Sequence, residues 1–217
     1  SHILSERDGG QTLKVFKYSN KPTATGTNYH IGRVTHEATT ETWGGSSFKS
    51  SKSYTYKNQL PKTVTVQGNG SESMTETFDY DRFGNLTERQ QAAAGLPTRT
   101  EKYSFTADGR FLEEYTDTEG LSTRFRYNTD GTLASETDPF GKQTQYSYDG
   151  WQRPTEVTDY LDKTHTTKYR WLGNLLIEHQ FGADGSQSQR WIDPWGRTLA
   201  EGTLGLEEWH WVSTQYD

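Results

Sequence analysis

The sequence lacks several features that define common protein classes. It contains no cysteine, which excludes disulfide bonds, thiolate metal ligands and a cysteine nucleophile. No apolar run approaches the roughly 18 residues of a membrane-spanning helix, so we expect no membrane span. Leu, Ile and Val number only 25 among 217 residues, and the mean hydropathy is −1.00. A thick aliphatic core is therefore not expected.

The charge balance excludes a further class. The chain has 23 Lys and Arg residues against 29 Asp and Glu residues, which gives a net charge of −6. Proteins that bind nucleic acids usually carry a basic patch that neutralises phosphates, so we expect no nucleic-acid partner. Intrinsic disorder is not indicated either. Disordered chains combine high net charge with few aromatic residues, whereas 13% of this chain is aromatic.

Aromatic residues are what the sequence has in abundance. Nine Phe, seven Trp and thirteen Tyr outnumber Leu, Ile and Val together. Many stand in pairs with one residue between them, as in Tyr146-Ser147-Tyr148. From Tyr80 to Ile192 the second position of the pair recurs every 21 to 25 residues, which indicates a structural repeat, and weaker copies extend it at both ends. The predicted repeat-core aromatics are Tyr56, Tyr80, Phe105, Tyr127, Tyr148, Trp171 and Trp211.

Each repeat is predicted to be a β-hairpin. Runs such as Thr144–Tyr148 alternate polar and aromatic residues with period two, which favours strands. The Asp-x-x-Gly and Asp-Gly segments that follow suit tight turns with a positive φ. We interpret Glu88–Gly95 as a loop insertion of at most one helical turn, because it is rich in Ala and coincides with the longest repeat step. The predicted turn glycines are Gly84, Gly109, Gly131 and Gly196.

The repeat also predicts a domain organisation. Residues 51–217 carry the regular pattern and are expected to form one repeat sheet. Residues 1–50 are expected to form divergent repeats with an insertion that contains Gly32–Glu37, continuous with the same sheet. The chain begins with Ser1-His2 and no apolar leader, and we interpret it as an internal fragment of a longer protein.

Two segments carry a resemblance to a known family. FDYDRFGNLTE at Phe78–Glu88 and YNTDGTLASETDPFGKQTQYSYDGWQRP at Tyr127–Pro154 resemble the YD repeat of RHS proteins. These proteins include bacterial polymorphic toxins, Tc toxin C components and the animal teneurins. The resemblance covers about Tyr54–Tyr216. It implies an all-β fold in which antiparallel hairpins form a spiral, single-layer sheet, of which this chain would be an open arc.

The resemblance also implies a function. In bacterial members the sheet forms a shell that encapsulates a C-terminal toxin domain, which here would be encoded outside the chain. The family's core-end segment, where its autocleaving aspartates lie, is not found in the sequence. We therefore expect a structural wall segment and no enzyme, with no catalytic, cofactor-binding or metal-binding residues. The expected partners are the remaining repeats and the toxin domain, and the expected location is secreted or at the cell surface.

An alternative function rests on tryptophan. Trp43 and Trp195 fall outside the repeat positions and could be exposed rings of a carbohydrate-binding or cell-surface-binding module. A fragment of a sheet would also leave two strand edges unpaired, so self-association through these edges is expected as well.

Overall fold

The computed structural model describes residues 2–7, 9–21, 23, 26, 29–70 and 72–216, apart from the Arg7 side chain. The chain divides into two compact units, Ser1–Leu121 and Ser122–Asp217. In both units every described regular element is a β-strand, and no helix of the described residues is long and apolar enough to cross a membrane.

The described residues of unit 1 form nine strands, each antiparallel to the next. The long strand β2 pairs with β3, β3 with β4 and β4 with β5, and the expected boundary at residue 50 lies inside β4. The strands are β1 (His2–Arg7), β2 (Gly10–Lys21), β3 (His30–Trp43), β4 (Ser46–Lys57), β5 (Leu60–Gln67), β6 (Met74–Tyr80), β7 (Leu86–Ala93), β8 (Arg99–Phe105) and β9 (Leu112–Thr116).

The described residues of unit 2 form nine further strands with the same antiparallel order. They are β10 (Ser122–Tyr127), β11 (Leu133–Thr137), β12 (Gln143–Tyr148), β13 (Pro154–Thr158), β14 (Thr164–Leu172), β15 (Leu175–Phe181), β16 (Gln187–Ile192), β17 (Thr198–Leu204) and β18 (Trp209–Ser213). Among the described residues no pairing joins β1 to β9 or β10 to β18, so neither sheet closes on itself. The prediction of an all-β fold built from antiparallel hairpins is confirmed.

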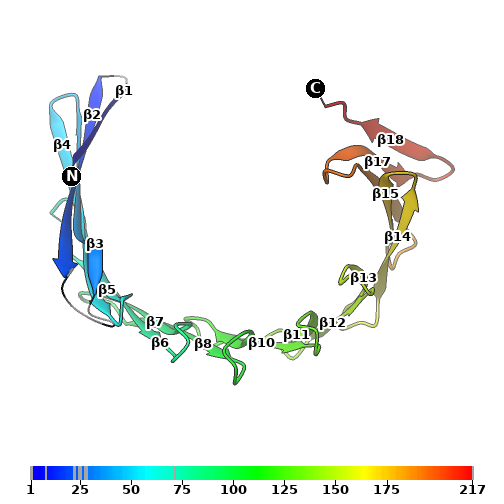
Figure 1. Ribbon diagram of the computed structural model, residues 1–217, viewed down its shortest axis with the longest axis horizontal. Helices are drawn as coiled ribbons and strands as arrows, with labels where there is room; N and C mark the ends of the chain where they lie inside the picture. The colour runs from blue at the N-terminus through cyan, green and yellow to red at the C-terminus, as the bar shows by residue number, and fades with distance from the viewer. Residues whose placement is uncertain are drawn as a thin grey trace. The chain divides into compact units, whose positions relative to one another are not determined.

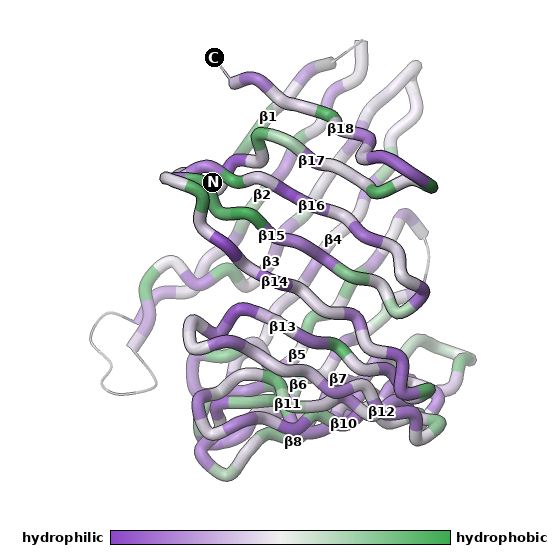
Figure 2. Tube along the Cα trace, turned by 90° about the vertical axis from the view of Figure 1, so that its right-hand side faces the viewer, coloured by the Kyte–Doolittle hydropathy of each residue, from purple (hydrophilic) through white to green (hydrophobic). Residues whose placement is uncertain are grey.

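Each sheet is one layer thick. Within each unit the strands lie side by side in a single bent layer (Figure 1). Hydrophilic and hydrophobic residues are interspersed along the strands (Figure 2). Among the described residues Ile177 is the one buried apolar side chain, at 3% exposure. The shortage of aliphatic residues is therefore explained, because a one-layer sheet has no interior to fill.

A β-bulge recurs in the hairpins and bends the sheet. In β12–β13, Ser147 pairs with Glu156 but the next residue, Tyr148, pairs with Pro154, so β13 carries one extra residue. An extra residue on one strand bends that strand and increases its twist. The same shift immediately precedes Tyr18, Tyr56, Tyr80, Phe105, Tyr127 and Ile192.

The tight turns share one hydrogen-bond arrangement. In the turn after β6, a single carboxylate oxygen of Asp81 accepts the N–H groups of Phe83 and Asn85 at 2.8 and 2.9 Å. Asp side chains commonly accept backbone N–H groups in this way, so the predicted turn chemistry is confirmed. The same pair of bonds forms at Asp117, Asp138, Asp149, Asp159 and Asp193.

The interpretation of Glu88–Gly95 as a loop insertion is wrong. Residues 88–93 belong to β7, which pairs with β6 along Met74–Tyr80 and with β8 from Glu88 to Gln91. The Ala-rich composition favours a helix only weakly, and pairing with two neighbouring strands outweighs it. The long repeat step from Tyr80 to Phe105 arises from β7 itself and from the turn that follows it.

Neighbouring turns interlock at Gly109, which has a φ of 73°. A Cβ atom there would lie inside the van der Waals surface of the Phe83 ring, and Asn85 Nδ2 donates to the Gly109 carbonyl at 2.7 Å.

We expect Gly109→Ala to lower the free energy of unfolding by about 2–4 kcal/mol, the sum of backbone strain and displacement of the ring. Gly120→Ala is the matched control: its φ is 80° and nothing lies within 4 Å. The control should cost about 1–2 kcal/mol in urea unfolding. Equal costs would contradict the interlock.

Candidate functional site

The two faces of the unit 1 sheet differ in chemistry. Register and alternation place one set of rings on the same side, which we call the aromatic face: Tyr54, Tyr56, Phe78, Tyr80, Tyr103, Phe105 and Tyr115. The opposite face carries threonines that bond across strands, with Oγ1 distances of 2.6 Å for Thr55–Thr63 and 3.1 Å for Thr65–Thr75. One face thus gathers the rings, whereas the other carries cross-strand threonines beside charged residues such as Glu88 and Lys102.

A row of charged side chains crosses the aromatic face. The Arg89 guanidinium donates to the Glu76 carboxylate and lies 3.4 Å from the Glu101 carboxylate. Tyr103 and Tyr115 donate to Glu101 at 3.2 and 3.4 Å, and their ring centroids lie 5.2 Å apart. The carboxylates are only 17% and 20% exposed. Every partly buried charge in the row therefore has a partner, which is what such burial requires.

The environment of this row shifts the pKa values of its members. Burial alone would raise the pKa of Glu76, but hydrogen bonds from Gln91 and Arg89 outweigh it and lower the pKa. Burial, and then the Glu101 carboxylate, raise the pKa of Tyr103. With these shifts Glu76 stays ionised and Tyr103 stays neutral at neutral pH. Neither shift moves a pKa towards neutrality, as a general acid or base at neutral pH would need.

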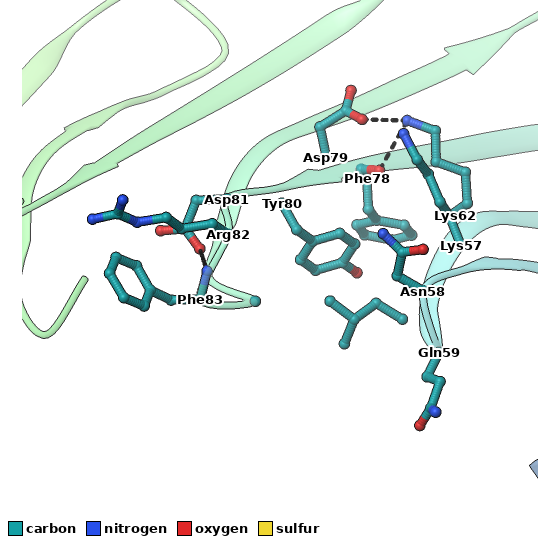
Figure 3. A pocket seen from close by; sticks show the side chains of 12 residues that line it. Lys57, Asn58, Gln59, Lys62, Phe78, Asp79, Tyr80, Asp81, Arg82 and Phe83 are labelled. Carbon is teal, nitrogen blue, oxygen red and sulfur yellow. Dashed lines mark hydrogen bonds and ion pairs between the residues drawn. The ribbon is translucent and has the colours of Figure 1, made fainter. Parts of the chain in front are cut away.

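A hollow of about 490 Å³ lies at one end of these strands (Figure 3). Phe78 and Tyr80 line it together with the β4–β5 turn at Asn58–Leu60 and the turn at Asp81–Gly84. Lys62 Nζ is engaged by the Asp79 carboxylate and by the Phe78 carbonyl oxygen at 3.1 Å. Burial raises the pKa of Tyr80. The hollow is lined by the rings of Phe78 and Tyr80 and by the Lys62 ammonium, whose charge is paired with Asp79. Such a lining is better suited to binding an apolar side chain than to catalysing a reaction.

The predicted repeat-core aromatics fall into two groups. Tyr56, Tyr80, Phe105, Tyr127 and Tyr148 are half-buried and follow the recurring bulge. Trp171 and Trp211 are 62% and 43% exposed, and neither follows a bulge. The structure thus places these two rings differently from the other five.

Tyr169 and Tyr216 take the repeat positions expected for the two tryptophans. Tyr56 donates its hydroxyl to the Val34 carbonyl at 2.6 Å. Tyr169 donates to Pro154 at 2.9 Å and Tyr216 to Thr198 at 3.0 Å. Each acceptor residue pairs with the residue after a bulge in the preceding hairpin.

An arginine accompanies each of these tyrosines. Arg33, Arg153 and Arg197 lie over the rings of Tyr56, Tyr169 and Tyr216 at 4.8, 4.2 and 4.8 Å. The steps Tyr148–Tyr169, Tyr169–Ile192 and Ile192–Tyr216 are 21, 23 and 24 residues, within the range of the other repeats. The sequence pattern missed this assignment because Trp171 and Trp211 stand two residues after another aromatic ring. An Arg at the end of the preceding turn is the signal that would have found it.

The predicted turn glycines Gly84, Gly109, Gly131 and Gly196 all have a positive φ. In the turn after β12 the equivalent residue is Gln152, with a φ of 60° and its N–H bonded to the Asp149 carbonyl at 2.9 Å. A residue with a Cβ atom is strained in this conformation by about 1–2 kcal/mol.

Gln152→Gly should therefore stabilise the chain by about 0.5–1 kcal/mol, the strain released less the extra entropy of an unfolded glycine. Gln143→Gly is the control, because this exposed strand residue has no positive φ. The control should destabilise by about 0.5–1 kcal/mol. Thermal unfolding of both variants measures the effects, and a destabilised Gln152→Gly would contradict the turn assignment.

The two tryptophans predicted as binding rings lie in separate units. Trp43 ends β3, is 62% exposed and covers Gly10, where a Cβ atom would lie 2.5 Å from the indole. Trp195 lies in the Asp193 turn, is 77% exposed and stands 5.1 Å from the Arg197 guanidinium carbon. Within the part of the chain that the structure describes, no group of three His, Asp or Glu side chains could hold a metal ion.

Comparison with known proteins supports the repeat assignment. The family model of the RHS Repeat matches residues 127–159, which span the hairpin β12–β13. No curated protein sequence matches the chain. The solved structure of a mutant Photorhabdus luminescens Tc holotoxin pore is similar, with a TM-score of 0.51 and 12% identity. The match covers 90% of this chain and 11% of that chain.

A crystal structure of a TcdB2–TccC3–Cdc42 complex matches over 95% of this chain and 13% of that chain, at 15% identity. Its TM-score of 0.35 is too low to indicate a shared fold. The predicted resemblance to RHS/YD-repeat proteins is confirmed over residues 127–159 by the repeat match, and the likeness to the holotoxin shows a similar fold. The chain carries an RHS repeat at residues 127–159, and it spans only 11% of the holotoxin chain that it resembles.

Proposed function

We propose that this chain is a wall segment of an RHS-repeat shell that encloses a second polypeptide, a toxin domain encoded outside the chain. The observation that carries the proposal is the one-layer sheet of each unit. Both faces of such a sheet are open, and Ile177 is the one buried apolar side chain of the described residues. A sheet that packs on no core of its own has a face available to pack against a second polypeptide. The likeness to the Tc holotoxin structure supports the same function.

The aromatic face is the surface that we propose to face the enclosed chain. Its rings are half-buried, so part of each ring stays open to contact. Rings and paired charges together offer weak contacts to many sequences and no single tight site. An unfolded guest with mixed side chains could lie against such a surface. The proposal gives the chain no catalytic role and places the intact protein outside the cell or at its surface.

Site-specific photocrosslinking of the intact protein that carries this segment tests the proposal. A photoreactive phenylalanine in place of Tyr103, on the aromatic face, should crosslink to the enclosed domain. The same residue in place of Thr77, on the opposite face, is the matched control and should not. Equal crosslinking from both faces, or none from Tyr103, would contradict the proposed orientation.

Carbohydrate or cell-surface binding at Trp43 and Trp195, and self-association through strand edges, remain predictions. Both rings are exposed enough to stack on a ligand. Among the described residues of unit 2, β18 pairs with β17 alone, and its other side would be the edge for such association.

A further inference from the structure

Two tyrosine rings face each other across the β8–β9 hairpin of unit 1. Tyr103 on β8 and Tyr115 on β9 are direct cross-strand partners, and their ring centroids lie 5.2 Å apart with an interplanar angle of 36°. Side chains that stand directly opposite each other in an antiparallel pair are held close together by the backbone. Strand pairing therefore keeps these two rings in contact, so they need no rearrangement to meet.

One carboxylate brings the hydroxyl ends of the two rings together. Tyr103 donates its hydroxyl to Glu101 Oε2 at 3.2 Å, and Tyr115 donates its hydroxyl to Glu101 Oε1 at 3.4 Å. The Glu101 carboxylate is itself held by the Arg89 guanidinium, at 3.4 Å. Because both hydroxyl groups converge on the same carboxylate, the ring carbons ortho to them lie at the same end of the pair.

The carboxylate is also placed to accept protons from the two phenols. Burial, and then the Glu101 carboxylate, raise the pKa of both Tyr103 and Tyr115, so both phenols are neutral at neutral pH. A neutral phenol that loses an electron must also lose its proton, and this transfer requires a base within hydrogen-bond reach. Glu101 has that position for both rings, and with 20% of its side chain exposed it can pass the proton to water.

We propose that Tyr103 and Tyr115 form a site of oxidative crosslinking, which a one-electron oxidant such as a peroxidase with hydrogen peroxide converts to dityrosine. Each phenol gives one electron to the oxidant and its hydroxyl proton to Glu101. The two phenoxyl radicals then form a C–C bond between their ortho carbons, and the hydrogens of these carbons move to the phenolic oxygens. The pair loses two hydrogen atoms in total, and one hydrogen peroxide is reduced to two molecules of water.

The crosslink would be a covalent staple in a chain that has no cysteine for disulfides. It closes a loop between β8 and β9, and a closed loop restricts the unfolded chain and so favours the folded one, as a disulfide does. The inference does not rest on the proposed shell, because both tyrosines lie in one hairpin of one unit.

Photo-oxidation of the 217-residue chain tests the site. Tris(bipyridine)ruthenium with persulfate and light removes single electrons from tyrosine, and gel filtration then isolates the monomer, so that only crosslinks within one chain are counted. Trypsin cleaves after Arg110, so the two tyrosines fall in separate peptides, Tyr103–Arg110 and Phe111–Arg124. We expect mass spectrometry to find these peptides joined, with a mass two hydrogen atoms below their sum. In concentrated urea, which separates the strands, the joined peptides should become much rarer.

Two conservative variants locate the crosslink. Tyr115→Phe should abolish the joined peptides, because the ring is kept but it can no longer form a phenoxyl radical. Tyr54→Phe is the matched control. Tyr54 also donates to a glutamate, Glu37 at 3.3 Å, but its partner on β5 is Val64, so its loss should leave the yield unchanged.

Glu101→Gln tests the proton acceptor. Coupling at neutral pH should slow at least about tenfold, because a positioned base commonly contributes more than that. The difference from the unsubstituted chain should shrink as pH approaches about 10, where phenols ionise without a base. A rate equal to that of the unsubstituted chain at neutral pH would overturn the role of the carboxylate. Absence of the joined peptides at an oxidant dose that modifies other tyrosines, or an equal yield in urea, would overturn the site itself.

Discussion

Acidification should unfold this protein well before it affects a typical globular domain. Seven aspartates in the tight turns have pKa values lowered by the donors around them: Asp81, Asp108, Asp130, Asp149, Asp159, Asp184 and Asp193. At Asp159, for example, the backbone N–H groups of Lys163 and Leu161 lower the pKa. The repeat architecture therefore uses the same ionised group in hairpin after hairpin.

The direction in which stability changes with pH follows from the linkage between proton binding and folding. A lowered pKa means that the folded state binds fewer protons than the unfolded state. The contribution of these aspartates to the free energy of unfolding is therefore fully present at pH values above about 5, and it falls as pH drops through about 4. Because several turns titrate together, the slope of unfolding free energy against pH should correspond to uptake of more than one proton. A one-layer sheet has little buried apolar area with which to offset this loss.

Urea unfolding at a series of pH values measures the slope. Asp193→Asn should lower stability at neutral pH and make the slope shallower, because the substituted side chain no longer titrates. The Asp193 carboxylate accepts the N–H groups of Trp195 and Arg197 and also Arg197 Nε at 2.8 Å. Glu207→Gln, at an exposed loop position, is the control and should leave the slope unchanged. Stability that is flat between neutral pH and about pH 3 would contradict the role of the turn aspartates.

Ile177→Ala should be among the most damaging single substitutions in the chain. Ile177 is 3% exposed in the centre of β15, where it pairs with Arg170 on β14 and Trp191 on β16. Truncation of a buried aliphatic side chain costs about 2–5 kcal/mol. In a one-layer sheet water reaches the vacated space easily, so we expect the lower half of this range, about 2–3 kcal/mol.

Val212→Ala is the matched control for this substitution. Val212 is also a β-branched strand residue of unit 2, but it is 72% exposed, and its truncation should change stability by no more than about 0.5 kcal/mol. Ile177→Val should fall between the two, at about 0.5–1.5 kcal/mol. Chemical denaturation of the three variants gives the comparison. Equal effects for Ile177 and Val212 would mean that unit 2 has no local centre of packing.

The sequence predicted the hairpins because each repeat carries its own evidence. Alternation, the aromatic pair and the Asp turn point to the same local structure, and the period of 21 to 25 residues repeats that evidence many times. Glu88–Ala93 was the exception, since its helix-favouring composition gives no sign of the two strands that flank it. Pairing between strands decides such a segment, and pairing is not a local property.

The candidate site was less predictable for the same reason. The network of Glu76, Arg89 and Glu101 exists only because three strands bring these residues into register. Trp211 looked like a repeat aromatic because it stands in an aromatic pair. The long β17 and its four-residue turn place it on the opposite face, and Tyr216 takes the repeat position. A shift of one residue in a strand moves a side chain to the other face, so spacing alone could not settle which ring belongs to which side.

Small-angle scattering of the intact protein that carries this segment tests the central claim most directly. If the one-layer sheets form the wall of a shell, the distribution of interatomic distances should be shifted towards large values, as for a hollow particle. Removal of the enclosed domain should lower the density at the centre and leave the outer dimension unchanged. A distribution typical of a solid globule, or an outer dimension that collapses when the domain is removed, would contradict the account.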